Sequence, residues 1–150
     1  MVDTVNAELA KGTLKISVRN FEYCEPYRDT MRKIAVDAKG VVRSYVKQAG
    51  SEDSSLNWHH YYDEAGRLRF AFIFGRATNG AKLEHRIYFD ESGKRIWEEQ
   101  KYLKDPQYFF PKVWPDDLEG KAGQAPPVQK SDPAKAFSAN SQCPEVKNDG

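Results

Sequence analysis

The sequence lacks a long hydrophobic run, an excess of charge of either sign, and any motif that holds a cofactor or marks a catalytic site. Its apolar runs extend over only a few residues, whereas a membrane-spanning helix needs about 20. The 23 basic and 22 acidic side chains leave a formal charge of +1, and a dedicated nucleic-acid binder carries a much stronger basic footprint. These absences argue against a transmembrane segment, a nucleic-acid partner and a cofactor.

Cysteine is also scarce. Cys24 and Cys143 are the only two, and neither lies in a CxxC or zinc-type spacing. They either form one disulfide around 118 intervening residues or remain free thiols, and both alternatives stay open.

Residues 1–6 carry neither the basic nor the apolar segment of a secretion signal. A cytosolic protein and a mature secreted chain both fit this start, and cysteines that permit a disulfide favour the periplasm or the extracellular space.

One pattern, Asp-x-x-Gly, occurs three times at intervals of 26 and 27 residues. In each copy the aspartate can accept hydrogen bonds from the backbone N–H groups that follow it. The glycine can adopt the positive φ of a turn that leads into a bulge. Apolar and polar residues alternate around the copies, so we assign them as hairpin turns. Their residues are Asp37 and Gly40, Asp63 and Gly66, and Asp90 and Gly93.

The alternating segments predict seven strands and no parallel βαβ units, because helical stretches between them are absent. The simplest fold is all-β: a curved antiparallel meander of about seven strands. The alternative is an α+β roll in which residues 1–10 or 22–33 form a short helix that covers the sheet. The predicted strands lie near residues 13–21, 31–37, 41–48, 57–63, 67–75, 83–90 and 94–102.

Alternation in the fifth predicted strand places Leu68, Phe70, Phe72 and Phe74 on one face and Ile73 on the other. Three exposed phenylalanine rings in a row would form an aggregation-prone patch. We therefore expect this phenylalanine stripe to face the interior.

The composition changes near Pro115. Of the 19 aromatic side chains, 18 lie in residues 1–115, and only Phe137 lies beyond them. Residues 116–150 contain too little apolar area to offset the entropy of ordering their backbone. We therefore expect a β-hairpin-repeat domain over residues 1–115, followed by a flexible C-terminal tail over residues 116–150.

Residues 61–68 (YYDEAGRL) and 88–95 (YFDESGKR) resemble the tyrosine-aspartate (YD/RHS-like) and MORN-variant β-hairpin repeats. The pattern of those repeats is Tyr-x-(Asp/Glu)-x-x-Gly-(Lys/Arg)-Leu. The resemblance covers residues 34–101, although the first copy, 35–42 (AVDAKGVV), lacks the aromatic residue and the copies are more widely spaced. It implies a curved stack of hairpins that serves as a scaffold or binding surface in bacterial surface, toxin-wrapping or immunity-type settings, without catalytic residues.

Histidines and paired acids are the other candidates for chemistry. Adjacent residues of a strand face opposite sides, so neither His59 with His60 nor Glu98 with Glu99 can act as a pair. In a meander, His60 and His85 would lie two strand spacings apart, about 9.5 Å. The sequence thus predicts no metal site, and a hydrolase triad assembled from distant residues has to be judged by geometry.

A further aromatic cluster lies near the end of the predicted domain, where prolines at positions 111 and 115 exclude an ordinary central strand. The cluster either packs across one mouth of the sheet and closes the core, or lies exposed as a binding patch. Its residues are Tyr108, Phe109, Phe110 and Trp114.

Together these features favour a non-enzymatic binding module that contacts another protein through a β-sheet surface. The alternative is a carrier of a small apolar ligand in a half-open β-barrel, because such sites are concave and lined by aromatic side chains. A hydrolase is the third hypothesis.

Overall fold

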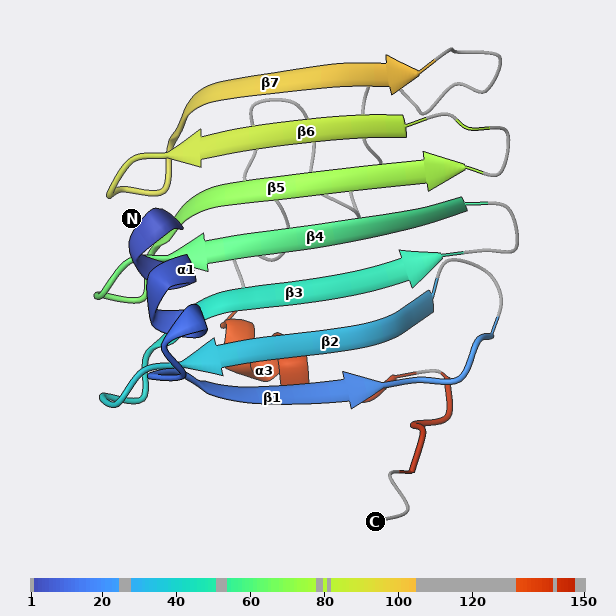
Figure 1. The fold of residues 1–150 in the computed structure, drawn as a ribbon, viewed down its shortest axis with the longest axis horizontal. Coiled ribbons are helices and arrows are strands. Elements are labelled where there is room, and N and C mark those ends of the chain that lie inside the picture. Colours follow the sequence, from blue (N-terminus) through green and yellow to red (C-terminus); the bar gives the residue numbers. More distant parts are fainter. Residues whose placement is uncertain are drawn as a thin grey trace.

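Seven strands form one antiparallel sheet in which each strand pairs with its neighbours in the sequence, in the order β1 to β7 (Figure 1). The predicted meander is confirmed, and a short N-terminal helix accompanies it. The computed structural model describes residues 2–24, 28–50, 54–77, 80, 82–104, 132–141 and 143–147. The elements in chain order are α1 (Val2–Ala10), β1 (Lys15–Asn20), β2 (Arg28–Val36), β3 (Val42–Gly50), β4 (Ser54–Tyr62), β5 (Leu68–Ala77), β6 (Lys82–Phe89), β7 (Arg95–Lys104) and α3 (Pro133–Ser138).

The three Asp-x-x-Gly copies lie in the β2–β3, β4–β5 and β6–β7 turns, all at one end of the sheet (Figure 1). Gly40, Gly66 and Gly93 have φ angles of 84°, 81° and 87°. In the central turn, Asp63 Oδ1 accepts a hydrogen bond from the Arg67 N–H at 3.0 Å. The other two turns repeat this bond. Each aspartate therefore holds its turn closed while the glycine supplies the backbone reversal.

Gly66→Val is expected to lower the free energy of unfolding by about 1–3 kcal/mol, because a β-branched residue is strained at positive φ. An added Cβ would lie 3.6 Å from Val41 Cγ1, which is an ordinary contact, so backbone strain rather than a clash causes the loss. Urea unfolding measures the effect. Ala65→Val, in the same exposed turn, is the control, and an equal loss there would contradict the assignment of Gly66 as the strained position.

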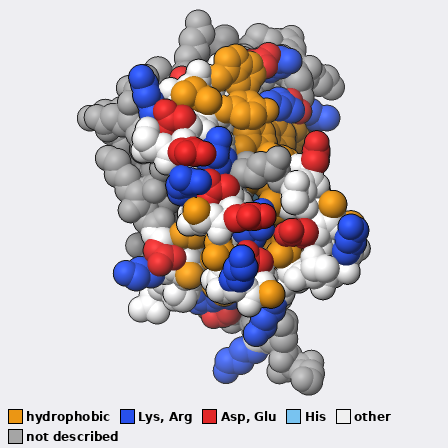
Figure 2. Space-filling view, turned by 90° about the vertical axis from the view of Figure 1, so that its left-hand side faces the viewer, with side chains coloured by type: hydrophobic (Ala, Val, Ile, Leu, Met, Phe, Trp, Pro, Cys, Tyr) orange, Lys and Arg blue, Asp and Glu red, His pale blue; other side chains and the backbone are white. Residues whose placement is uncertain are grey.

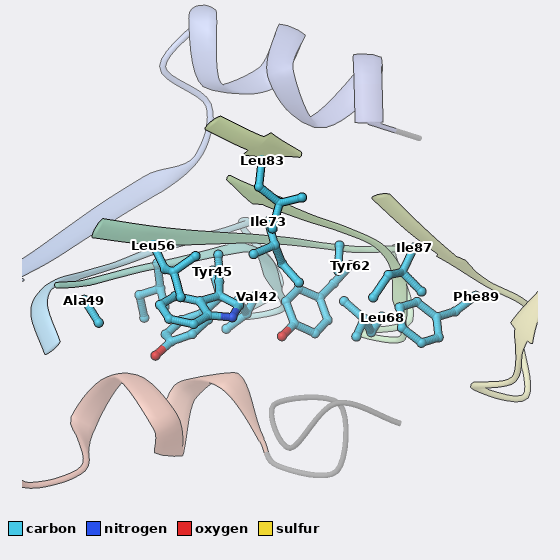
Figure 3. Packing of buried hydrophobic residues seen from close by; sticks show 13 residues of the cluster. Val42, Tyr45, Ala49, Leu56, Tyr62, Leu68, Ile73, Leu83, Ile87 and Phe89 are labelled. Carbon is cyan, nitrogen blue, oxygen red and sulfur yellow. The ribbon is translucent and has the colours of Figure 1, made fainter. Parts of the chain in front are cut away.

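The sheet lies between α1 and α3 (Figures 1 and 3), and we call its two sides the α1 face and the α3 face. On the α1 face, Val5 of the helix packs with Leu14, Ala35, Tyr61 and Phe70. The α3 face carries the larger core. Its buried residues are Ile34, Val42, Tyr45, Ala49, Leu56, Trp58, Tyr62, Leu68, Ala71, Ile73, Leu83, Ile87 and Phe89.

The phenylalanine stripe is not placed as predicted. A register shift next to the β4–β5 turn inserts one extra residue into β5, so Leu68 turns to the α3 face and is buried there with Ile73. The phenylalanines remain together on the α1 face. Phe70 is buried against α1, whereas Phe72 and Phe74 are only half-buried. The larger core on the α3 face therefore contains Ile73, which alternation assigned to the outside, together with Leu68.

Part of the predicted flexible tail over residues 116–150 lies against the sheet. Of this range the structure describes residues 132–141 and 143–147. Within them, the Asp132 carboxylate caps the first turn of α3, and Phe137 packs against the core of the α3 face. The helix α3 forms although the segment has few apolar residues, because it packs against the core that the sheet already provides.

Covalent and polar contacts fasten this segment to the sheet. Cys24 and Cys143 form a disulfide, with their Cα atoms 5.7 Å apart. Arg19 and Arg32 donate hydrogen bonds to the carbonyl oxygen of Phe137 at 2.6 and 3.2 Å. Both guanidinium groups thus satisfy backbone acceptors that the short helix leaves open at its C-terminus.

Candidate functional site

The residues singled out in the sequence do not form a site among the described residues. The aspartates and glycines of the three turns hold the hairpins, and the two cysteines are bonded to each other. The aromatic cluster of Tyr108, Phe109, Phe110 and Trp114 lies outside the described residues. The described side chains best placed to contact a partner lie instead on the α1 face.

An aromatic row crosses four strands on the α1 face. Strand register pairs Tyr61 with Phe70, Phe70 with Tyr88, and Tyr88 with Trp97. The successive ring centroids are 5.8, 4.7 and 5.3 Å apart, which is the spacing of favourable aromatic pairs. We call these four residues the aromatic row.

Exposure rises along the aromatic row. Tyr61 and Phe70, near α1, are 6% and 8% exposed, whereas Tyr88 and Trp97 are 40% and 48% exposed. Figure 2 shows hydrophobic side chains gathered in the upper part of the molecule, at the end of the sheet where β6 and β7 lie. The buried half of the row thus anchors the exposed half.

A second set of rings on the same face carries stacked arginines. The guanidinium of Arg86 lies over the Phe72 ring and that of Arg76 over the Phe74 ring, each 4.7 Å from the centroid. Glu84 forms an ion pair with Arg86 at 2.7 Å. Stacking holds the planar guanidinium groups in place while their edges remain able to donate hydrogen bonds.

The sequence patterns singled out neither Tyr88 nor Trp97 as a site residue. A register shift beside the Asp90 turn inserts one extra residue into β7, so Trp97 rather than Ile96 lies opposite Tyr88 in the β6–β7 hairpin. Their exposure could not be predicted, because it depends on how far along the sheet α1 reaches.

A serine and a histidine also meet on the α1 face. Ser44 Oγ lies 3.0 Å from His59 Nε2, and the Tyr61 hydroxyl lies 3.2 Å from His59 Nδ1. This is the connectivity of a nucleophile, a base and an orienting group. However, Ser44 is only 3% exposed, and burial together with Lys33 lowers the pKa of His59 to about 4, which makes the imidazole a weak base. The network fits a structural role that joins β3 to β4.

Stability should fall as the pH drops from about 6.5 towards 4. Burial lowers the pKa of His59 to about 4 and, with Lys47, that of His60 to about 3. Below pH 6.5 the unfolded chain therefore binds protons that the folded state does not bind. The free energy of unfolding then falls by about 1.4 kcal/mol per pH unit for each histidine. Urea midpoints measured across this range test the prediction. His60→Phe removes one of the two groups and should reduce the slope by about half; an unchanged slope would contradict the prediction.

A histidine, a glutamate and an arginine lie together on the α3 face. Glu98 Oε2 lies 3.1 Å from His85 Nε2 and 3.0 Å from Arg95 Nη1. Within the described residues, no group of three histidine, cysteine or carboxylate side chains is arranged to hold a metal ion. The His85–Glu98 contact therefore links β6 to β7, and the Arg95–Glu98 ion pair lies within β7.

No protein-family model, curated protein or solved structure matches this chain. None of the described helices has the length and apolar character needed to cross a membrane.

Proposed function

We propose that this protein is a non-enzymatic binding module that contacts another protein through the exposed end of the aromatic row. The observation that carries the proposal is the continuous row of rings, whose exposed fraction rises from 6% at Tyr61 to 48% at Trp97. Tyrosine and tryptophan dominate protein interfaces, because rigid rings bury a large area at a small cost in side-chain entropy. The row presents two such rings that their neighbours already hold in position.

The charges beside the row favour a protein partner over nucleic acid. Glu84 neutralises Arg86 at 2.7 Å, and Glu99 neutralises Lys101 at 2.9 Å. A surface for nucleic acid needs unpaired cations to displace the counterions of the phosphates. Mixed and locally paired charges around large rings are instead common at the rims of protein interfaces.

Two further features support this proposal. The Cys24–Cys143 disulfide is what an oxidising compartment permits, so we propose a periplasmic or extracellular location. The hairpins with positive-φ glycines have the geometry that the resemblance to tyrosine-aspartate and MORN-variant repeats implies. Those repeats act as scaffolds and binding surfaces.

Trp97→Ser is expected to raise the Kd for the protein partner at least tenfold, because truncating a central ring of an interface commonly costs more than 1 kcal/mol. The partner is captured from the source organism with the wild-type protein, purified and titrated by calorimetry. Ile96→Ser is the control, since Ile96 is 60% exposed on the same strand but lies outside the row. Equal affinities for wild type and Trp97→Ser would overturn the proposal.

A further inference from the structure

Strand β7 forms one edge of the sheet, and within the described residues no strand pairs with its outer side (Figure 1). Every second residue of an edge strand directs its backbone N–H and C=O groups outward, where they can pair with a further strand. The side chains along this edge are also accessible, since Ile96, Trp97, Glu98 and Lys101 are all exposed. The described part of the chain therefore leaves the β7 edge open to another strand.

The opposite edge of the sheet, formed by β1, is partly covered by residues 143–147. The backbone N–H of Val146 donates a hydrogen bond to the carbonyl oxygen of Asn20 at 2.8 Å. The carbonyl oxygen of Pro144 accepts a hydrogen bond from the N–H of Glu22, also at 2.8 Å. A head-to-tail row of copies, with β7 of one paired to β1 of the next, would meet this covered end. Pairing between two β7 strands avoids it and closes the assembly after two copies.

The two faces of the sheet restrict how two β7 strands can pair. Glu99 and Lys101 lie on the α1 face, because they are opposite Arg86 and Glu84 of β6, and Arg86 covers the Phe72 ring on that face. Residues directly opposite each other in antiparallel strands share a face, and alternate residues of one strand do so too. A symmetric pair must therefore have its two-fold axis through a residue of β7 and not between two residues.

The charges of β7 select one of these axes. An axis through Gln100 places Glu99 opposite Lys101 of the second copy, and symmetry repeats this pair. An axis through Glu98, Glu99 or Lys101 instead places that charge opposite its own copy, which is destabilising. An axis nearer either end of β7 (Arg95–Lys104) leaves half of the strand or more unpaired. Edge charges commonly prevent pairing with arbitrary strands; these charges also accept a second copy in a single register.

We infer that β7 pairs antiparallel with β7 of a second copy of this chain, around a two-fold axis at Gln100. The pair joins two seven-stranded sheets into one continuous sheet. Because the axis is perpendicular to the sheet, the aromatic rows of both copies lie on the same side. The inference goes beyond the proposed function, and self-association and affinity for a different protein are measured separately, so each can fail without the other.

Exchanging the two charges tests both the dimer and its register. The full-length wild type should sediment as a dimer in analytical ultracentrifugation at micromolar to millimolar concentrations. Glu99→Lys places two lysines opposite each other, and Lys101→Glu places two glutamates opposite each other, so each variant alone should raise the dimer Kd at least tenfold. An equimolar mixture of the two variants should form a heterodimer, because every lysine then faces a glutamate. ¹⁵N labelling of one variant identifies the heterodimer in native mass spectrometry.

Two further variants separate pairing across the axis from effects on folding. Glu99→Lys combined with Lys101→Glu restores the ion pair within β7 as well as the pairs across the axis, so this double variant should dimerise like the wild type. Lys15→Glu makes the same change of charge on β1 and should leave the dimer Kd unchanged. A monomeric wild type or double variant would overturn the inference. Single variants that dimerise as tightly as the wild type would overturn it as well, as would a mixture without heterodimer.

Discussion

Ile73→Ala is expected to lower the free energy of unfolding by about 2–5 kcal/mol, whereas Phe72→Ala, at the next residue, should cost only about 1 kcal/mol. Ile73 is completely buried on the α3 face, so its truncation leaves a cavity in the larger of the two described cores. Phe72 is half-buried on the α1 face, and Arg86 covers its ring at 4.7 Å. Removing the Phe72 ring therefore returns much of its surroundings to water rather than leaving a void.

The two variants form a matched pair, because they differ by one position and test opposite faces of β5. Urea unfolding at neutral pH measures both, with Arg69→Ala as a control in the same strand. A larger loss for Phe72→Ala than for Ile73→Ala would reverse the assignment of the faces. Such a result would support the buried phenylalanine stripe that simple alternation predicts.

Replacing both Cys24 and Cys143 by serine is expected to cost about 3–5 kcal/mol. The disulfide joins residues 119 positions apart, and a loop of this length restricts the unfolded chain strongly in the chain-entropy model. The bond also holds Phe137 against the core of the α3 face and keeps the C-terminal carbonyl groups near Arg19 and Arg32. The loss therefore includes contacts as well as entropy.

Chemical unfolding of the double variant, and of the wild type with and without a reducing agent, measures this loss. The reduced wild type should resemble the double variant. An unchanged midpoint in both would mean that the C-terminal segment is dispensable, as the composition of residues 116–150 predicts. A chain that ends at Pro115 should lose at least as much stability as the double variant.

The hairpins could be predicted from the sequence because their causes are local. Asp63 and Gly66 encode the central turn through hydrogen bonds and backbone angles that involve only a few neighbouring residues. The seven strands follow because each one pairs with the next. The face of each side chain was less predictable, since a single bulge beside the turn sends Leu68 to the opposite side of the sheet.

The candidate sites depend on contacts between distant parts of the chain, and the sequence could not reveal these. Trp97 is exposed and Phe70 buried because α1 reaches only part of the α1 face. The buried polar atoms of His60 and Tyr62 have no hydrogen-bond partner among the described residues, and this becomes visible only once their burial is known. Likewise, Phe137 looked isolated in a polar segment, although tertiary packing places it on the core.

The order of the strands has a consequence for how the protein is made. Every described strand after β1 pairs with the one synthesised just before it, so hairpins can assemble one after another as the chain is synthesised. Cys24 appears early, but its partner Cys143 emerges only after all seven strands. The disulfide therefore forms only in molecules whose synthesis has reached the C-terminal segment.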